Sequence, residues 1–310
     1  MYNPIKPSKT KILNLIKKTW KSPYLEIIPS SYVIFKRKFN YSEVDHTDGI
    51  GTKGLYHWKK KTLKNAVIDA LAMNLNDLAM VGATPYKLQN HIVLPKDDTE
   101  SIVEIIDALV KECLKRKIAI TGGETSIQDT SDGIDISITV SGFIKKNKVN
   151  QFQIGDVLIG LPSSGIHSNG ITKIRELYKN QIKDEFVVPT KIYSDLLLPI
   201  FDKFDLHGRM HITGGAFTKL KDLLNEADAI ITNTHKLKPQ LIFYEIYKKG
   251  VKDEVMYKTF NCGIGFVLSV NKKDVKDVLK VTNGDVIGEI VKGSGKVIIN
   301  SMFSEKMIEL

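Results

Sequence analysis

Apolar residues recur at helical spacing in two long segments of the first half of the chain. Residues 63–81, LKNAVIDALAMNLNDLAMV, place apolar side chains on more than one face and run into Gly82, which predicts a mostly buried helix that ends there. Residues 99–116 carry a single apolar stripe behind a polar N-cap, Asp98 or Thr99, which predicts an amphipathic helix. Both helices are long enough to cover one face of a sheet.

Strand patterns complete the first half. Residues 117–121 form a short predicted strand that leads directly into Gly122-Gly123-Glu124-Thr125. The alternation that begins at Ile134, in IDISITVSGFI, predicts a long strand. The lysine-rich N-terminal residues predict only a short helix around 12–20 and a strand around 32–39. We therefore expect an α+β domain with a mixed sheet.

A second pattern of strands and helices begins near residues 150–156. A predicted strand, DVLIGL, is followed by a glycine-serine loop and by a helix through Ile174 and Leu177. We expect an α/β second half, so that the chain forms two domains, residues 1–154 and 155–310. The remaining predicted elements of this half are a helix at 214–224, a helix through 275 and 279, and strands at 229–232, 263–270, 285–291 and 297–300.

The charge balance does not favour a nucleic-acid-binding protein. The formal net charge is +10, but nearly all of the positive residues are lysines, and no basic stretch is interleaved with aromatic residues. Scattered lysines are typical of a solvated surface. We expect no nucleic-acid partner, although a moderate positive field would steer an anionic substrate toward the protein.

The cysteines and the N-terminus indicate a cytoplasmic protein. Cys113 and Cys262 lie far apart and outside any CxxC spacing, which argues against a disulfide framework and against a zinc site. The N-terminus lacks the apolar core of a signal peptide, and no apolar run approaches membrane-spanning length. We therefore expect a soluble protein of the reducing cytoplasm.

The first polar segment with candidate chemistry is TDGIGTK, residues 47–53. Its glycines allow backbone N–H groups to approach anionic oxygens, Asp48 has a ligand type that suits a hard cation, and Lys53 is a point charge for a phosphate. The segment is neither a Walker A loop nor a dinucleotide fingerprint. The alternative is an ordinary glycine turn with a solvated aspartate and lysine.

The second segment is Asn76-Asp77, which lies inside the predicted buried helix two turns after Asp69. A buried carboxylate is costly unless a cation or hydrogen-bond donors lie beside it. The helix therefore predicts a metal ion or a capping partner for these aspartates. Aspartates that are hydrogen-bonded to backbone N–H groups remain the alternative.

Three further segments follow predicted strands or precede predicted helices. Residues 122–125, GGET, are expected at the C-terminal end of a strand, where sheet-based folds place ligand contacts, although Glu124 could simply pair with a lysine. Residues 163–170, SSGIHSNG, and 211–215, HITGG, each precede a predicted helix, where N–H groups and hydroxyls bind anions. Two such loops indicate two anionic groups. His167 taken alone is more typical of a structural histidine.

Taken together and in this order, these segments resemble the aminoimidazole ribonucleotide synthetase family, from about Thr47 to the C-terminus. TDGIGTK, MNLNDLAMVGATP and GGET are themes that related ATP-dependent synthetases share. The stretches IHSNG, PTKIY and MYKTFNCGIG point specifically to phosphoribosylformylglycinamidine cyclo-ligases. The resemblance implies two α/β domains, with N-terminal domains that pair in a homodimer and help to form a cleft for ATP.

The resemblance also implies an activity: ATP-dependent ring closure of formylglycinamidine ribonucleotide to 5-aminoimidazole ribonucleotide, with release of ADP and phosphate, in purine biosynthesis. Catalytic roles would fall to Asp48, Lys53 and His167, and Mg²⁺ to Asp48, Asp77 and Glu124. The residues implied for ATP are Asp48, Gly49, Gly51, Thr52, Lys53, Asn76, Asp77, Asn90, Gly122, Gly123 and Glu124. Those implied for the substrate's ribose phosphate are Ser164, Gly165, His167, Ser168, Asn169, Gly170, Thr213, Gly214 and Gly215.

Two departures from the family keep other functions open. Residues 24–39 contain no glycine, whereas the family carries a glycine-rich stretch before TDGIGTK, and Gln89-Asn90-His91 replaces a Leu-Asp-Tyr element. Asn90 keeps an oxygen ligand but removes one negative charge. The alternatives are a sister enzyme, namely a selenophosphate synthetase, a thiamine-monophosphate kinase or a hydrogenase-maturation protein, and a nucleotide-binding paralogue without turnover. A selenophosphate synthetase would need a reactive residue near the N-terminus, where this chain has no cysteine.

Overall fold

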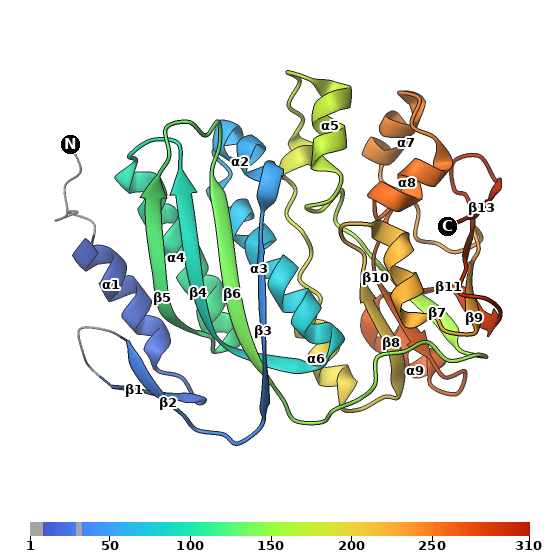
Figure 1. Cartoon of the computed structure of the whole chain (residues 1–310), viewed down its shortest axis with the longest axis horizontal. Coiled ribbons are helices and arrows are strands. Elements are labelled where there is room, and N and C mark those ends of the chain that lie inside the picture. Colours follow the sequence, from blue (N-terminus) through green and yellow to red (C-terminus); the bar gives the residue numbers. More distant parts are fainter. Residues whose placement is uncertain (1–8, 29–32) are drawn as a thin grey trace. The chain divides into compact units, whose positions relative to one another are not determined.

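A computed structural model of the chain describes residues 9–28 and 33–310 and divides them into two compact units (Figure 1). The first unit contains the described residues up to 78 together with 83–145. The second unit contains 146–310 together with the short segment 79–82. The main division thus falls between Lys145 and Lys146. The mixture of helices and mixed sheets in two units confirms the predicted fold class.

The first unit contains a hairpin, a four-stranded sheet and helices on one side of that sheet. The hairpin strands are β1 (Leu25–Ile28) and β2 (Ile34–Arg37), and the sheet strands are β3 (Ser42–Gly49), β4 (Ala83–Leu94), β5 (Ala119–Ile127) and β6 (Asp135–Ile144). The helices are α1 (Lys9–Lys17), η1 (Lys18–Trp20), η2 (Gly51–Lys53), α2 (Gly54–Lys60), α3 (Leu63–Met80) and α4 (Thr99–Arg116).

Most of the elements predicted for the first half are confirmed. The long helix, the amphipathic helix and the long strand are α3, α4 and β6, and the Asp98 carboxylate caps α4 by accepting from the Ser101 N–H at 2.9 Å. The short N-terminal helix is α1 with η1, and the strand around 32–39 is β2, although Tyr32 lies outside the described residues.

The sheet order β3-β6-β4-β5 brings three strand ends to one edge. β6 runs antiparallel to both β3 and β4, while β4 and β5 are parallel and joined by α4, so β3, β4 and β5 all point the same way. Figure 1 shows α4 behind β4 and β5. The C-terminal ends of these three strands, which carry the candidate ATP residues, therefore lie along the same edge.

The two faces of this sheet differ in character. Leu88 and Ile138 are fully buried and belong to the face on which α3 and α4 pack, which we call the helix face. Neighbouring positions point the other way because side chains alternate along a strand. We call that side the open face, and at the upper end of the strands it carries the polar side chains of Thr47, Gln89, His91, Glu124 and Thr139.

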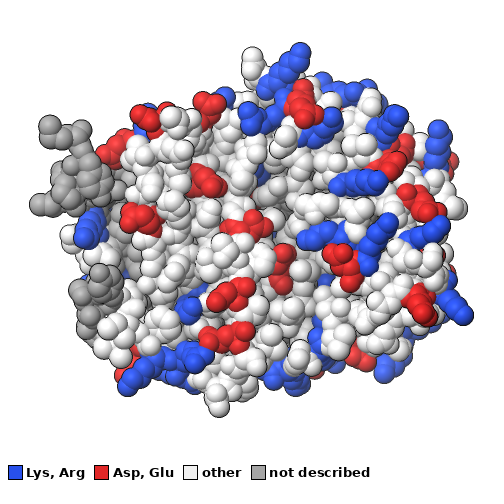
Figure 2. All heavy atoms as spheres, in the orientation of Figure 1, with Lys and Arg blue, Asp and Glu red and all other residues white. Residues whose placement is uncertain are grey.

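The lower part of the open face is covered by the β1–β2 hairpin. Phe143 of β6 contacts Phe39 with ring centroids 4.4 Å apart, and Tyr24 meets the same ring edge-on at 5.2 Å. Leu25, Tyr86 and Ala119 complete this apolar cluster. Figure 2 shows the molecule from the side of the open face, where uncharged residues and acidic groups predominate over β4, β6 and β3.

The second unit is built on a seven-stranded sheet of order β13-β12-β9-β11-β7-β10-β8. Its strands are β7 (Val157–Pro162), β8 (Leu206–His211), β9 (Ala227–Ile231), β10 (Ile264–Val270), β11 (Asp285–Lys292), β12 (Val297–Asn300) and β13 (Met307–Glu309). Its helices are α5 (Ile171–Tyr178), η3 (Asp184–Val187), α6 (Ser194–Phe201), η4 (Ala216–Leu223), α7 (Leu241–Lys248), α8 (Asp253–Thr259) and α9 (Val275–Thr282). The strands and helices predicted for this half are present, with the 214–224 helix in 3₁₀ form.

The cysteines and the helix lengths bear on the disulfide and membrane questions raised by the sequence. Cys113 and Cys262 are both buried free cysteines. Across residues 9–28 and 33–310, every helix is too short or too polar to span a membrane.

Candidate functional site

A single row of paired residues crosses the sheet of the first unit at the level of the candidate ATP residues. Asp48 of β3 lies opposite Ile138 of β6, Ile138 lies opposite Asn90 of β4, and Asn90 lies opposite Gly123 of β5. All four positions belong to the helix face, since paired residues share a face of a sheet. The fold thus aligns three of the predicted sites that are far apart in the sequence.

At the β3 end of this row, two carboxylates meet a histidine that the sequence analysis did not select. His46 Nε2 lies 3.3 Å from Asp77 Oδ2, and His46 Nδ1 lies 3.0 Å from the amide oxygen of Asn74. Asn74 also donates to the backbone oxygen of Asp48 at 3.1 Å. The hydrogen bond to Asp77 raises the pKa of His46, although burial acts in the opposite direction. Asp77 is thus the direct partner of His46, and the Asp48 carboxylate acts on the imidazole through its charge.

Lys53 does not face this group of residues. Its ammonium is fully buried and lies 2.8 Å from Oδ2 of Asp69, which also receives a contact of 2.8 Å from His57 Nε2. Burial alone would raise the pKa of Asp69, but Lys53 and His57 hold it well below its usual range. The charged partners of Asp69 are thus Lys53 and His57. Lys53 joins η2 to α3 by this ion pair, and its ammonium is not exposed to a phosphate in solution.

The GGET segment lies inside β5 and not at its end, because the strand continues to Ile127. Gly123 and Thr125 belong to the helix face, whereas Glu124 pairs with His91 in the open-face row. The Glu124 carboxylate accepts from the Thr125 N–H at 2.8 Å. The structure therefore separates Glu124 from Asp48 and Asp77, although the sequence analysis grouped the three as metal ligands.

The donor set fits Mg²⁺ only in part. Among the described residues, no group of three or more His, Cys, Asp or Glu side chains is arranged to hold a metal ion. Mg²⁺ is commonly held by one or two carboxylates together with substrate phosphates and water. Asp77, which contacts His46, and Asp48, whose charge acts on the same imidazole, are the candidate carboxylates for such a site.

The other predicted ATP residues lie at several places in the first unit. Gly49 ends β3, Gly51 and Thr52 form η2, Asn76 is fully buried on α3, and Gly122 lies beside Gln89 on the open face. Gly51 has a φ of +53° and open space where a side chain would begin. A ligand could therefore approach the backbone at Gly51 closely.

In the second unit, the SSGIHSNG loop is held by contacts from three other segments. Asn169 is buried and donates to the Ile212 carbonyl at 3.0 Å, which joins this loop to HITGG. Ser168 lies 3.2 Å from the Thr190 hydroxyl, and Asn261 donates to the Gly165 carbonyl at 2.8 Å. The segments PTKIY and FNCGIG thus support the predicted substrate loops.

His167 is part of the internal structure of its loop. It is fully buried, has a φ of +59°, and accepts a hydrogen bond at Nε2 from the Ser164 N–H at 3.1 Å. A left-handed backbone at a residue other than glycine is sparsely populated and is often kept at functional sites. The ring therefore positions the exposed Ser164 end of the loop. Gly170, the last residue before α5, also has positive φ, at +66°.

The HITGG segment ends in an exposed turn with a lysine beside it. Gly214 and Gly215 are exposed, and Gly214 has open space where a Cβ would stand. Lys219, one turn into η4, donates to the buried Thr213 hydroxyl at 2.9 Å. A cation next to backbone N–H groups and a hydroxyl is a typical environment for a phosphate.

Several of these residues escaped the sequence analysis. Thr190 and Lys191 lie in the quoted PTKIY stretch but received no role, and burial lowers the pKa of Lys191. Lys219 had no motif around it. His46 could have been found by strand alternation, because it lies two residues before Asp48 and therefore on the same face.

Both halves of the chain match family models. Residues 33–144 match the N-terminal domain of AIR synthase related proteins, and residues 153–300 match the C-terminal domain of the same family. A phosphoribosylformylglycinamidine cyclo-ligase of Saccharolobus solfataricus is 38% identical over 81% of this chain and 79% of its own length. One from Clostridium perfringens is 36% identical over 76% of each chain.

Solved structures of more distant proteins share the fold. Escherichia coli HypE, a hydrogenase maturation protein, superposes with a TM-score of 0.71 at 15% identity, over 97% of this chain and 96% of its own. Thiamine-monophosphate kinase of Stenotrophomonas maltophilia gives 0.67 at 17% identity, over 98% and 99%. A HypE structure in complex with ATP gives 0.69 at 13% identity, over 99% and 95%.

Proposed function

This chain belongs to the family of AIR synthase related proteins, and we propose that it is a phosphoribosylformylglycinamidine cyclo-ligase that makes 5-aminoimidazole ribonucleotide for purine biosynthesis. The observation that carries the proposal is the 38% identity to a relative of that name over 81% of the chain. The solved structures of sister enzymes, HypE and thiamine-monophosphate kinase, share the fold at 13–18% identity.

ATP supplies the driving force of the reaction in this proposal. The γ-phosphoryl group passes to the formyl oxygen of formylglycinamidine ribonucleotide and ADP leaves. The ring nitrogen then attacks the formyl carbon, the carbon–oxygen bond breaks with release of phosphate, and the nitrogen loses a proton. Phosphorylation turns a poor leaving group into a good one, and the protein mainly positions the two reactants.

We assign the ATP phosphates to the first unit. Asp48 and Asp77 would hold Mg²⁺, which would supply positive charge against the phosphates, while the backbone around Gly51 and Thr52 would receive the phosphate oxygens. His46 orients the Asp77 carboxylate through their 3.3 Å contact. Support for ATP comes from the family and from the HypE structure in complex with ATP.

We assign the substrate's ribose phosphate to the loops of the second unit. Ser164, Ser168 and the turn at Gly214 and Gly215 present hydroxyls and backbone N–H groups, and Lys219 supplies the positive charge. His167 and Asn169 act as positioning residues, because both are buried and bonded within or between the loops.

The protein acts as a homodimer in the cytoplasm in this proposal. The described helices α3 and α4 pack on one face of the first unit's sheet, which leaves the upper open face available to a second copy. Light scattering of the purified protein tests the dimer.

A coupled assay with formylglycinamidine ribonucleotide, ATP and Mg²⁺ tests the function. ADP and aminoimidazole ribonucleotide are measured together, and equal amounts of the two are expected. ADP without the imidazole product would assign the chain to a sister kinase or synthetase. Neither product, with ATP still bound, would make it a nucleotide-binding paralogue.

A further inference from the structure

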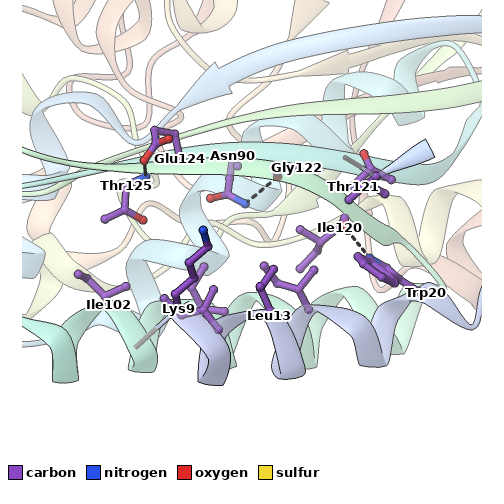
Figure 3. A pocket seen from close by; sticks show the side chains of 15 residues that line it. Lys9, Leu13, Trp20, Asn90, Ile102, Ile120, Thr121, Gly122, Glu124 and Thr125 are labelled. Carbon is purple, nitrogen blue, oxygen red and sulfur yellow. Dashed lines mark hydrogen bonds between the residues drawn. The ribbon is translucent and has the colours of Figure 1, made fainter. Parts of the chain in front are cut away.

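The row of paired residues across the first sheet ends in two different surroundings. At its β5 end, where a bulge at Thr121 shifts the pairing with β4 by one residue, Asn90 lines a cavity of about 350 Å³ between β5, α1 and α4 (Figure 3). At its β3 end, Asp48 is followed by η2, where the backbone of Gly51 has open space beside it. The position of this exposed backbone depends on how η2 is attached to its neighbours.

Backbone contacts hold η2 against the strands at both of its ends. Before η2, the Ile50 N–H donates to the Ile136 carbonyl at 3.2 Å, just beyond the last paired residues of β3 and β6. After η2, Gly54 lies so close to the start of β6 that a Cβ there would stand 1.8 Å from the Ile134 carbonyl oxygen. These contacts join the turn to the sheet, and side chains of the same segment join it to α3.

Two side chains of this segment converge on one carboxylate of α3. Lys53 of η2 contacts both oxygens of Asp69, with Nζ 2.9 Å from Oδ1 and 2.8 Å from Oδ2. His57 of α2 reaches the same carboxylate, with Nε2 2.8 Å from Oδ2. All three side chains are fully buried, so bulk water does not screen their contacts. Since Lys53 and His57 lie about one helical turn apart, the segment is attached to α3 at two points.

The ring of His57 is fixed by a second contact. Its Nδ1 lies 2.8 Å from the hydroxyl of Thr62, the residue immediately before α3. A single tautomer of the neutral ring satisfies both contacts: the Nε2–H group donates to Asp69, and Nδ1 accepts from the Thr62 hydroxyl. Lys53 already supplies the one positive charge that Asp69 balances, and a second charge would be costly in a fully buried site. His57 therefore acts as a hydrogen-bond donor to Asp69 and not as a second cation.

The second attachment restrains the turn more than the ion pair does alone. A carboxylate held by one lysine can rotate about its Cβ–Cγ bond, and the lysine can follow it. The hydrogen bond from His57 removes this freedom, because it fixes the direction of Oδ2 while both oxygens face Lys53. The backbone of Gly51 and Thr52 lies between the sheet contact at Ile50 and this anchor, so it is held in one orientation.

We propose that His57 is a positioning residue of the nucleotide site, which acts through Asp69 and Lys53 to hold the backbone of Gly51 and Thr52 in the orientation that receives the phosphates of ATP. The inference rests on the proposed function, which assigns the ATP phosphates to this backbone. His57 itself does not touch the nucleotide, since its ring is fully buried between Asp69 and Thr62. Loss of its donor should therefore weaken phosphate binding although no ligand group is removed.

Calorimetric titration of the full chain with Mg-ATP and with Mg-tripolyphosphate tests this role. His57→Met removes the donor but keeps a side chain of similar length, and we expect both ligands to bind about tenfold more weakly. His57→Gln returns an N–H donor near the position of Nε2, so both affinities should recover to within about threefold of the wild type. This recovery would distinguish a positioning role from a loss of packing.

Val110→Ala is the control for a general loss of stability, because Val110 is buried on α4 of the same unit and has no part in the network. It should lower the melting temperature and leave both affinities unchanged. Wild-type affinity in His57→Met, no recovery in His57→Gln, or an equal loss of affinity in Val110→Ala would overturn the inference.

Long-range ¹H–¹⁵N correlation spectra of the histidine rings give a second readout. The ring whose signals disappear in His57→Gln should carry its proton on Nε2, and a proton on Nδ1 would contradict the network. Product formation is scored separately from binding. Ring closure by the wild type with unaltered binding in His57→Met would reject the inference and keep the cyclo-ligase assignment, whereas weakened binding in His57→Met without ring closure by the wild type would do the reverse.

Discussion

The Lys53 ammonium and the Asp69 carboxylate lie 2.8 Å apart, and neither side chain is exposed to solvent. Removing one partner of a buried ion pair leaves the other charge buried without compensation. Lys53→Met should therefore lower the free energy of unfolding by about 3–5 kcal/mol. Urea denaturation measures the change.

Asp107→Asn is the control for that prediction, because the Asp107–Lys111 pair on α4 is largely exposed. It should cost less than about 1 kcal/mol. The double variant Lys53→Met with Asp69→Leu should recover part of the loss. If the Lys53→Met protein were as stable as the wild type but bound phosphate more weakly, Lys53 would be a direct phosphate ligand and not a structural residue.

The contact between His46 and Asp77 predicts a pH-dependent stability. Because the hydrogen bond to Asp77 raises the pKa of His46, this pair stabilises the fold fully below the unfolded pKa and loses its effect as pH rises through the raised folded value. His46→Gln should thus lose more stability at about pH 5.5 than at about pH 9. Denaturation midpoints across this range test it, with His91→Gln as an exposed control. A pH-independent loss would refute the pairing.

Asp77 is predicted to be needed for binding of the metal–nucleotide complex. Asp77→Ala should abolish Mg²⁺-dependent ATP binding, because only Asp48 remains to hold the cation. Titration calorimetry in the presence and absence of Mg²⁺ measures the effect, and Asp107→Ala serves as a surface control. Unaltered Mg²⁺-dependent binding in Asp77→Ala would remove this residue from the site.

Lys219 is predicted to recognise the phosphate of the substrate. Lys219→Met should raise the KM for formylglycinamidine ribonucleotide by about tenfold to a hundredfold, because a charge-assisted hydrogen bond is lost. The KM for ATP should stay the same. Lys221→Met, an exposed lysine on the same helix, is the matched control. Equal changes in the two KM values would indicate a general loss of structure.

Asn169 is predicted to set the spacing of the two substrate loops. Asn169→Ala leaves the Ile212 carbonyl without its donor, at a cost of about 1–3 kcal/mol. We expect a higher KM for the ribonucleotide and a lower melting temperature, whereas Asn300→Ala on β12 should change only the latter. An Asn169→Ala enzyme with wild-type KM would show that the link is dispensable.

The sequence analysis found the long helices of the first half and most strands, but it did not identify helices α2, α6, α7 and α8 or strands β1, β3, β4, β8 and β13. In β4, buried apolar residues alternate at Leu88, Ile92 and Leu94, but Asn90 occupies a core-facing position between them. A polar residue at such a position breaks the period of two by which strands are recognised. Asn90 therefore conceals the strand.

Residue types alone also could not decide which candidate ligands meet. Glu124 and Asp77 both looked like metal ligands, yet strand alternation and the β5 bulge place Glu124 on the open face. Motifs therefore identified the segments, while the geometry of the sheet selected the residues within them.

The bulge at Thr121 also determines where β5 can change in length during evolution. Deleting Thr121 would leave Ile120 paired with Leu88 and Gly122 paired with Gln89 in a regular ladder, so the other side chains of β5 would keep their faces. Deleting a residue that is paired in the ladder would instead turn the side chains that follow it to the opposite face, because side chains alternate along a strand. β5 can therefore lose one residue at the bulge, whereas a deletion on either side of the bulge would move polar and apolar side chains to the wrong faces of the sheet.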